Sequence, residues 1–532
     1  MVQFFWSFAV FCTACCAALT LQRVLHMFQQ AGYQHPSYRQ WLRKNRKEPR
    51  AAKRWMPVLI LCAGIYFGKW WLLLVGAALF VLLCRPAKAK KPLVYTPRVI
   101  RLAVTAALFF VLYILFCYYA YYWCVVMAYA TGSLALVILG TLAPLTCPAV
   151  LILLQYRLVL LYDWINRPME KAINNRYLRE ARDVLRGMPG LTVIGITGSY
   201  GKTSVKHDLF KLLSGRYEVY MTPGNYNTTL GVVRAIREGL RPTHQIFLCE
   251  MGARHLGDIR EICDLVHPKI GILTSVGPQH LETFGSQENV LRGKLELAQA
   301  VEDGGTLLIN RDSPLLAAHE FDQKLITYGS NNCDYTISNQ KIDEDGASFI
   351  ISAPDGTQQA FRTRLLGGAN VQNLCGAVAL AHTLGVPLPE LAAAAQALDP
   401  VPHRLELRRG EGLSIIDDAY NSNPEGAKIA LDTLAMGTGT KICITPGLVE
   451  LGEQELAYNR DLGAYAAGRC DWLLTVGKQA RTEAIRQGAA ESGLRRDRIL
   501  SCDTVQEAVL KAHSLPGEHK LALLLNDLTD NY

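Results

Sequence analysis

A glycine-rich segment that contains one lysine and one threonine offers the clearest chemistry in this sequence. It reads, in order, Gly198, Ser199, Tyr200, Gly201, Lys202 and Thr203. The apolar stretch 191–197 before it predicts a buried parallel strand, and 205–213 after it predicts a helix. Glycines at such a junction let backbone N–H groups approach phosphate oxygens, which the helix N-terminus also attracts. The segment therefore predicts a phosphate-binding loop for ATP, with Lys202 on the β- and γ-phosphates and the Thr203 hydroxyl on Mg²⁺.

The spacing of this loop is not the standard one, because residue 196 is isoleucine where G-x-x-x-x-G-K-[ST] has glycine. Residues 197–203 instead resemble the loop of the Mur ligases, ATP-dependent enzymes that form amide bonds in the synthesis of peptidoglycan precursors. Further segments that resemble this family follow in its order: 250–253, 271–286, 294–297, 310–312, 370–373, Arg404 and 417–424. The resemblance covers residues 191 to 526. The segment 417–424 is most similar to the branch that adds D-alanyl-D-alanine to UDP-muramoyl tripeptide.

The resemblance implies catalytic roles for residues outside the loop. Glu250 and His280, each interpreted as lying just after a strand, are expected to ligate a second Mg²⁺. Lys294 aligns with a lysine that the family often carries as a carbamate, which turns a cation into a metal-binding anion; the alternative is an ordinary lysine on a surface helix. The implied catalytic residues are Lys202, Lys294 and His280, and the implied metal ligands are Thr203, Glu250 and His280.

The nucleotide is expected to lie at the boundary of two domains. The resemblance assigns its phosphates to Gly198, Ser199, Gly201, Lys202 and Thr203. It assigns the adenine edge to Asn373, and phosphate and ribose contacts to Arg404 and Asp418. The Asn-rich stretch 223–229 resembles the family's loop that faces the substrate, and the alternative is an ordinary Asx-rich turn.

The chemistry of such an enzyme accounts for these residue types. An unactivated carboxylate is a poor electrophile, so the family first phosphorylates it to an acyl phosphate, which an amine then attacks with release of phosphate. Negative charge builds up on phosphoryl oxygens, so the protein mainly supplies metal ions and fixed positive charges.

The sequence departs from the family at several positions. Tyr200 stands where asparagine is usual in the loop, Ala369 replaces a histidine, and Asn459 replaces another histidine after the segment that begins at Glu450. Residues 525–527 replace the family's terminal Lys-Gly-Ser. Apolar segments stand in place of the UDP-sugar-binding domain with which the D-alanyl-D-alanine-adding enzymes begin. The acceptor and the incoming amine therefore stay open.

The elements that must position these residues predict a multi-domain fold. Strands alternate with helices after residue 191, which predicts an α/β P-loop central domain over 191–400. Asp-Gly pairs at 345–346 and 355–356 predict hairpins within it. A second, Rossmann-like α/β domain is expected over 401–532, with strands at 413–416, 441–445, 472–476 and 521–525.

Residues 1–160 have a different composition, with long apolar runs separated by basic stretches. Spans are expected at 4–21, 102–128 and 134–155, and 57–84 is expected to form a hairpin or re-entrant pair that turns near Lys69. Basic loops mark the cytoplasmic side of a membrane. The pattern predicts an α-helical region with four or five passes of a bacterial cell membrane, a linker helix over 161–190, and catalytic domains in the cytoplasm.

The charge and cysteine content exclude other classes of function. The net charge of +9 does not indicate nucleic-acid binding, because the basic residues cluster between apolar runs without interleaved aromatic side chains. The 15 cysteines do not indicate a zinc site, because the C-x-x-C pair Cys12 and Cys15 lies in an apolar run and those from Cys249 to Cys502 are scattered singly. The apolar runs lack the acidic residues or histidines of an ion path, which argues against a transporter.

The leading hypothesis is a membrane-embedded ligase that joins a muramoyl-peptide-like or lipid-linked carboxylate to an amino acid or to D-alanyl-D-alanine. The alternatives are a ligase for another polymer, such as poly-γ-glutamate, and a membrane ATPase without ligase activity. The set of Lys202, Glu250, His280 and Lys294 favours the ligase, since ATP binding alone needs neither second-metal ligands nor a carbamate lysine.

Overall fold

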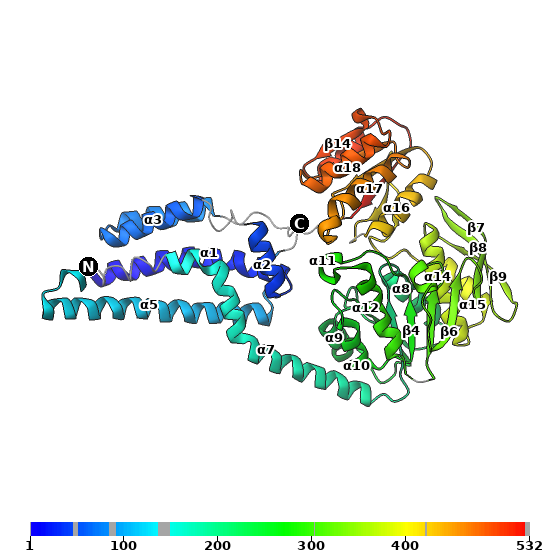
Figure 1. Cartoon of the computed structure of the whole chain (residues 1–532), viewed down its shortest axis with the longest axis horizontal. Helices are drawn as coiled ribbons and strands as arrows, with labels where there is room; N and C mark the ends of the chain where they lie inside the picture. The colour runs from blue at the N-terminus through cyan, green and yellow to red at the C-terminus, as the bar shows by residue number, and fades with distance from the viewer. Residues whose placement is uncertain are drawn as a thin grey trace. The chain divides into compact units, whose positions relative to one another are not determined.

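The computed structural model describes residues 2–45, 52–84, 92–136, 149–302, 304–420 and 423–526. The chain divides into two compact units between Asn174 and Asn175, inside one long helix. Figure 1 shows a helical N-terminal unit and a catalytic unit built around two sheets. The two units are described separately.

The N-terminal unit is entirely helical in its described residues. Its helices are α1 (Val2–Gln30), α2 (His35–Lys44), α3 (Ala52–Tyr66), α4 (Trp70–Leu83), α5 (Pro97–Thr131), the π turn η1 (Ala149–Leu153) and the first part of α7 (Gln155–Arg186). By length and composition, two stretches of the described chain could cross a membrane: Ser7–Gln30 and Pro97–Thr131. The first begins later and ends later than the expected span 4–21, and the second contains the expected span 102–128. The expected span 134–155 falls largely on residues 137–148, which lie outside the described residues.

Helices α3 and α4 form an antiparallel pair that breaks at residues 67–69, which confirms the predicted turn near Lys69. The two backbones approach closely because glycines face the partner helix. A Cβ atom added to Gly64 would lie 2.8 Å from Leu73, and one added to Gly76 would lie 2.9 Å from Leu61. With 15 and 14 residues, each helix is about 22 Å long, too short to cross a bilayer core of about 30 Å alone.

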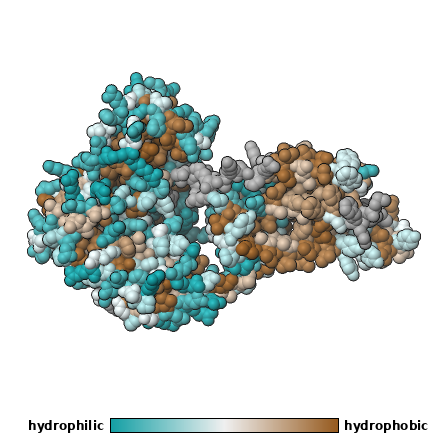
Figure 2. All heavy atoms as spheres, turned by 180° about the vertical axis from the view of Figure 1, so that it is seen from behind, coloured by the Kyte–Doolittle hydropathy of each residue, from teal (hydrophilic) through white to brown (hydrophobic). Residues whose placement is uncertain are grey.

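A layer of charged side chains ties α2, the start of α5 and the start of α7 together. Asp163 on α7 accepts a hydrogen bond from Arg98 at 3.0 Å and pairs with His35 at 2.9 Å. Arg101 pairs with Glu170 at 2.6 Å. These charges lie at one end of α5, whereas its middle exposes a stripe of large apolar side chains, Leu108, Leu112, Phe116 and Tyr119. Figure 2 shows this unit as the apolar part of the surface.

The catalytic unit begins with a nine-stranded sheet. Its strands are β1 (Thr192–Thr197), β2 (Val219–Met221), β3 (Ile246–Glu250), β4 (Ile270–Leu273), β5 (Thr306–Asn310), β6 (Lys324–Gly329), β7 (Tyr335–Asp343), β8 (Gly346–Ser352) and β9 (Gln358–Thr363). The order is β2-β3-β1-β4-β5-β6-β7-β8-β9, with parallel pairing up to β7 and antiparallel pairing among the last three strands. Both predicted hairpins are confirmed. Strand β1, between β3 and β4, leads into the glycine-rich loop.

Helices cover both faces of this sheet. They are α8 (Lys202–Leu213), α9 (Thr229–Gly239), α10 (Asp258–Val266), α11 (Leu281–Phe284), α12 (Gln287–Ala300), α13 (Pro314–Ala317), α14 (Gly368–Thr383) and α15 (Leu388–Gln396). Helices α8, α14 and α15 share one apolar core, and α9, α10 and α12 share another. Helix α12 lies so close to β1 that a Cβ atom on Gly195 would be 2.6 Å from Leu297. This glycine therefore lets α12 bring its own polar residues near the loop.

A second, six-stranded sheet forms the C-terminal domain. Its elements are β10 (Glu406–Arg408), β11 (Ser414–Asp418), α16 (Pro424–Met436), β12 (Thr440–Thr445), η2 (Gly452–Gln454), α17 (Glu455–Ala467), β13 (Trp472–Val476), α18 (Ala480–Glu491), η3 (Arg496–Arg498), β14 (Ile499–Cys502), α19 (Val505–Ser514) and β15 (Lys520–Leu525). The order is β10-β11-β15-β12-β13-β14, and only β10 is antiparallel. The four predicted strands are confirmed, whereas β10 and β14 were not predicted. Both are short strands at the edges of the sheet.

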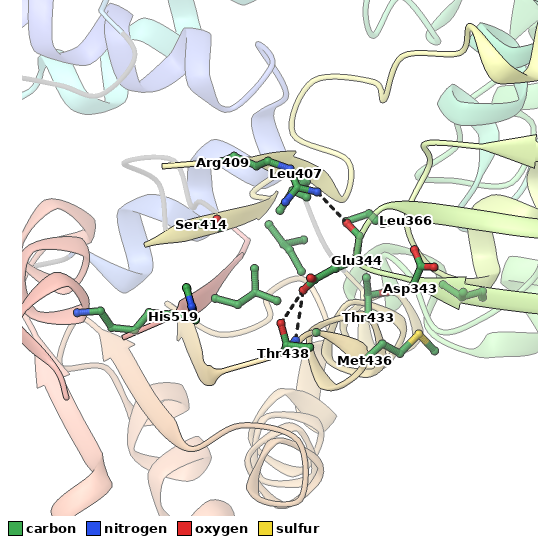
Figure 3. A pocket seen from close by; sticks show the side chains of 15 residues that line it. Asp343, Glu344, Leu366, Leu407, Arg409, Ser414, Thr433, Met436, Thr438 and His519 are labelled. Carbon is green, nitrogen blue, oxygen red and sulfur yellow. Dashed lines mark hydrogen bonds between the residues drawn. The ribbon is translucent and has the colours of Figure 1, made fainter. Parts of the chain in front are cut away.

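The tip of the β7–β8 hairpin touches the C-terminal domain. Asp345 pairs with Arg409 at 2.6 Å, and the Thr438 hydroxyl donates to Glu344 at 2.8 Å. A pocket between the two domains is lined by these elements and by apolar side chains such as Leu366 (Figure 3). None of the site residues predicted from the sequence lines it. These contacts of Glu344 and Asp345 with Thr438 and Arg409, here called the interdomain strap, therefore join the domains away from the predicted site residues.

Candidate active site

The glycine-rich loop occupies the junction between β1 and α8, as predicted. Gly201 has φ +83°, a left-handed conformation that favours glycine, and a Cβ atom there would lie 2.3 Å from the Oδ1 atom of Asn373. A Cβ atom on Gly198 would lie 2.0 Å from the Thr274 hydroxyl. The Ser199 hydroxyl donates to the Gly277 carbonyl at 3.0 Å, which anchors the loop to the chain after β4. The loop is thus a fixed cradle of backbone that suits phosphate oxygens.

Lys202 folds back over this loop. Its Nζ atom donates to the carbonyls of Gly198 and Ser199. Burial lowers the pKa of Lys202 to about 8, an effect that the nearby Glu250 opposes and that Arg404 of the C-terminal domain reinforces. Lys202 and Arg404 are therefore electrostatic neighbours although they belong to different domains. A phosphate placed between them would favour the charged form of the amine.

Glu250, the last residue of β3, gathers polar groups around a buried carboxylate. The Thr203 hydroxyl donates to it at 3.1 Å, the Asn227 amide at 3.1 Å, and Lys206 pairs with it at 2.9 Å. Burial opposes ionisation, but Lys206, Lys202 and these hydrogen bonds hold the pKa of Glu250 below its ordinary value. The carboxylate and hydroxyl oxygens of Glu250 and Thr203 are the donor types that Mg²⁺ prefers, so this pair fits the expected metal.

Lys206 is a member of this cluster that sequence reasoning missed. It is fully buried and also donates to the carbonyls of Thr222 at 2.9 Å and Gly224 at 2.8 Å. These carbonyls belong to the chain that leads into the Asn-rich stretch 223–229. Within that stretch Asn227 contacts Glu250, and Thr228 caps α9. Lys206 therefore joins this stretch to the Glu250 carboxylate. Its spacing, one turn beyond Lys202 on an otherwise apolar face of α8, was the only signal for it.

Lys294 on α12 is only 1% exposed, so the alternative that it is an ordinary surface lysine is wrong. Burial lowers the pKa of Lys294 well below its ordinary value, and the positive charge of Lys202 adds to this. Glu250 acts on it in the opposite direction. The amine makes no hydrogen bond within the described part of the chain. A buried, neutral amine is the form that can react with CO₂, so the environment suits the expected carbamate, which stays a prediction.

His280 lies beyond the end of β4 at Leu273, not directly after a strand as the sequence suggested. It precedes α11 with φ +51°, and its Nδ1 atom forms a hydrogen bond with the Glu450 carboxylate of the C-terminal domain. Arg254 also pairs with Glu450, at 3.2 Å. Burial lowers the pKa of His280, and Glu450 opposes this shift. His280 is linked electrostatically to Lys294, whereas no direct contact joins it to Glu250 among the described residues.

The C-terminal domain brings Asn423 and Arg404 towards the loop, and Asp418 lies near Arg404. Asn423, which caps α16, donates to the Ser199 carbonyl at 3.4 Å. Arg404 lies 4.5 Å over the ring of Tyr420. Burial raises the pKa of Asp418 to about 7, although Arg404 opposes the shift. The structure therefore brings Arg404 and Asp418 together, as expected for residues that share one ligand.

Asn373, by contrast, lies directly against Gly201 of the glycine-rich loop. This places its side chain beside the phosphate cradle. Its assignment to the adenine edge stays a prediction.

Two of the unusual residues of the C-terminal domain hold the loop that carries Glu450. Asn459 accepts from the Leu448 N–H at 2.8 Å and donates to the Leu448 carbonyl at 3.0 Å. Asn526 donates to the Gly447 carbonyl at 2.8 Å, and Arg481 donates to the Pro446 carbonyl at 3.1 Å. The replacements at 459 and 526 thus have a structural role in fixing residues 446–448.

Both domains of the catalytic unit are similar to domains of known proteins. Residues 196–381 match the Mur ligase middle domain, and residues 403–525 match the Mur ligase glutamate ligase domain. The UDP-N-acetylmuramoyl-tripeptide--D-alanyl-D-alanine ligase of Mycobacterium tuberculosis is 35% identical over 318 residues, which are 57% of this chain and 62% of that protein. The ligase of the same name from Escherichia coli is 30% identical over 307 residues, 56% of this chain and 67% of that protein. The chain thus spans less than two thirds of the mycobacterial relative.

Two solved structures share the fold. The crystal structure of MurF from Acinetobacter baumannii superposes with a TM-score of 0.60 at 26% identity and covers 66% of this chain and 77% of that one. MurF ligase from Thermotoga maritima, solved in complex with ADP, gives a TM-score of 0.60 at 25% identity and covers 66% of this chain and 80% of that one.

Proposed function

We propose that this chain, which belongs to the Mur ligase family, is an ATP-dependent ligase that adds D-alanyl-D-alanine to a muramoyl-tripeptide acceptor. The observation that carries the proposal is the contact of the buried Glu250 carboxylate with the Thr203 hydroxyl, at 3.1 Å, at the end of the glycine-rich loop. The amine of Lys294 is buried and near enough to Lys202 and Glu250 for their charges to act on its pKa. The charge of Lys294 also acts on the pKa of His280, which relates His280 to this group of residues. An ATP-binding protein without ligase chemistry would need Lys202 for the phosphates, but it would not need the buried amine of Lys294 near the buried Glu250 carboxylate.

Each group in the proposed site has its own role in the reaction. ATP supplies the phosphoryl group that turns the acceptor carboxylate into an acyl phosphate, and Mg²⁺ supplies positive charge for the phosphoryl oxygens. Residues 198–203 bind the phosphates, and Lys202 neutralises charge that grows in the transition state. Thr203, Glu250 and His280 are the metal ligands, and Lys294, as a carbamate, adds an anion to that set. The attacking amine then displaces phosphate and leaves an amide.

The remaining nucleotide contacts are proposed on the side of the C-terminal domain. Arg404 and Asp418 hold phosphate and ribose, and Asn373 binds the adenine edge. The domains are proposed as a central domain over 191–400 and a C-terminal domain over 401–532, joined by the linker 161–190 to an N-terminal membrane region.

We also propose that the N-terminal unit anchors the enzyme in a bacterial membrane, with the catalytic unit on the cytoplasmic side. The exposed apolar stripe of α5 supports insertion, because side chains such as Leu112 and Phe116 would otherwise face water. Gln29 at the end of α1 donates to the Val94 carbonyl, just before α5, at 2.8 Å. Two helices whose end and start meet would cross in opposite directions. The charged layer around Asp163 would then lie at the cytoplasmic face.

A lipid-linked acceptor is the second candidate, and the apolar stripe of α5 is the observation that favours it. An enzyme held at the bilayer would meet an acceptor that is itself held there.

The test uses the full chain in detergent with ATP and Mg²⁺. It compares UDP-muramoyl tripeptide, a lipid-linked muramoyl tripeptide and a γ-glutamyl peptide as acceptors, each with and without D-alanyl-D-alanine. We expect release of phosphate only when acceptor and dipeptide are both present, together with a product heavier by the dipeptide less water. Steady ADP formation with neither substrate would instead support a membrane ATPase. A product formed from the γ-glutamyl peptide but from neither muramoyl acceptor would support ligation of another polymer.

A further inference from the structure

The contact between Glu450 and His280 crosses the boundary between the two domains of the catalytic unit. The Glu450 carboxylate binds the His280 ring, and the Glu450 carbonyl accepts from the Glu282 N–H at 3.2 Å. The side chains of His280 and Glu450 are 14% and 13% exposed. Both residues have left-handed backbone, φ +51° and +63°, which non-glycine residues keep only where the surroundings fix it.

The chemistry of the pair determines which ring nitrogen is available. A carboxylate only accepts hydrogen bonds, so the Nδ1 atom of His280 carries the proton. The Nε2 atom then has a free lone pair, which is what a metal ligand needs. Histidines that bind metals usually donate their other N–H to a carboxylate or carbonyl, which fixes the ring orientation and raises the basicity of the ligating nitrogen.

We propose that Glu450 is a positioning residue that orients His280 for the metal when the C-terminal domain docks on the central domain. The inference rests on the proposed function, because it takes His280 as a ligand of Mg²⁺. All the proposed ligands lie in the central domain, yet one of them is held in place from the other domain. Metal binding and domain docking are therefore coupled, and each strengthens the other.

The loop that delivers Glu450 is built for a fixed position. Asn459, Asn526 and Arg481 hold the backbone of residues 446–448, and the Glu450 carbonyl itself is bonded to the Glu282 N–H, so the position of the carboxylate is restricted. An alternative is that Glu450 serves only as an ion-pair partner for Arg254. The side chain of Arg254 is 59% exposed, and ion pairs with such a partner stabilise proteins weakly. The two explanations differ in what they predict for the metal.

The test measures Mn²⁺ binding by electron paramagnetic resonance on the full chain in detergent with ADP, with Mn²⁺ in place of Mg²⁺. Glu450→Ala should weaken one class of bound Mn²⁺ roughly 10–100-fold. Glu450→Gln keeps an acceptor for Nδ1 without the charge and should lose less. The matched control Glu453→Gln changes an exposed acid three residues away and should bind Mn²⁺ like the unaltered chain. Arg254→Met should also leave Mn²⁺ binding close to normal.

A double variant gives the sharpest result. If Glu450 acts through His280, then His280→Ala with Glu450→Ala should bind Mn²⁺ no more weakly than His280→Ala alone. Additive losses, or Mn²⁺ binding by Glu450→Ala that equals the Glu453→Gln control, would overturn the inference. Thermal unfolding of each variant checks folding, and the isosteric Glu450→Gln keeps the test valid if Glu450→Ala is unstable.

The outcomes for the inference and for the proposed function are separable. A chain that binds Mn²⁺ in a Glu450-dependent way but forms no product with any acceptor would contradict the ligase and leave the inference intact. A chain that ligates normally and binds Mn²⁺ equally well without Glu450 would contradict the inference alone.

Discussion

Both sheets of the catalytic unit have polar residues near the carboxyl ends of two neighbouring strands, but the partners of these residues differ. Near the ends of β1 and β3, the amines of Lys202 and Lys294 have lowered pKa values. The carboxylate that acts on both, Glu250, is already paired with Lys206. Around β12 and β15 the loop 446–450 is held by side-chain amides that bond its backbone. The first arrangement favours an anionic ligand. In the second, the backbone of residues 446–448 has its hydrogen-bond partners within the protein, although the Oδ1 atom of Asn526 is buried without a partner among the described residues. We therefore expect the chemistry to depend mainly on the central domain, to which the C-terminal domain contributes a fixed loop.

The largest effect is expected at Lys202, the cation closest to the loop. Lys202→Ala removes the positive charge from the phosphates, so product formation should fall at least about 10³-fold, as for other preorganised groups that stabilise developing charge. Product is measured by mass spectrometry. The exposed Lys211 on the same helix provides the matched control, and Lys211→Ala should keep full activity. Normal ligation by Lys202→Ala would refute the assignment of the loop.

The next effect concerns the Lys206–Glu250 pair. Lys206→Met leaves a buried carboxylate without its cation, which should destabilise the catalytic unit by about 3–5 kcal/mol. The double variant Lys206→Met with Glu250→Gln removes both charges and should recover much of this stability without recovering activity. Denaturant unfolding followed by fluorescence measures both. Equal stability of the single and double variants would contradict a buried ion pair.

Lys206 also shows which parts of the site could not be predicted from the sequence. The loop, its strand and its helix were predictable because glycine, lysine and threonine have fixed spacing within one continuous segment. Lys206 and Glu450 were missed because their importance comes from burial and from a partner distant in the chain, at 250 and 280 respectively. The edge strands β10 and β14 were missed because three or four residues carry too little periodicity. Lys294 was identified through resemblance, and only its burial distinguishes it from a surface lysine.

On the C-terminal side, Asn459 should be the most sensitive position. Asn459→Ala leaves the buried N–H and carbonyl of Leu448 without partners, at a cost of about 1–3 kcal/mol. The loosened loop should also weaken Mn²⁺ binding in the same direction as Glu450→Ala. Asn459→Asp keeps the acceptor for the Leu448 N–H but sets a buried carboxylate against the carbonyls of Leu448 and Glu455, so it should be at least as damaging in both measurements. Weaker nucleotide binding with unchanged Mn²⁺ binding would contradict the division of roles between the two sheets.

The affinity for ADP should depend on pH because Lys202 of the central domain changes its protonation near pH 8. The pKa of Lys202 is about 8 without ligand, and phosphate favours the protonated amine, so binding raises this pKa. ADP binding should therefore take up a proton above pH 8, and its affinity should fall by about tenfold per pH unit there until the pKa of the complex is reached. Calorimetry in two buffers of different ionisation enthalpy measures the proton. Lys202→Ala should abolish the uptake, and proton uptake that persists in this variant would assign it to another group.

The smallest effect is expected at the strap between the domains, and it separates docking from ligand orientation. The side chains of Arg409 and Asp345 are 61% and 73% exposed, so Arg409→Ala should change stability by less than about 1 kcal/mol and activity by less than about twofold. If Glu450 mattered only because it holds the domains together, loss of the strap would resemble loss of Glu450 on a smaller scale and would weaken Mn²⁺ binding. If Glu450 orients His280, Arg409→Ala should leave Mn²⁺ affinity unchanged. Mn²⁺ titration of Arg409→Ala beside Glu450→Ala therefore decides whether the rigid loop of the second sheet contributes to the metal site or only to docking.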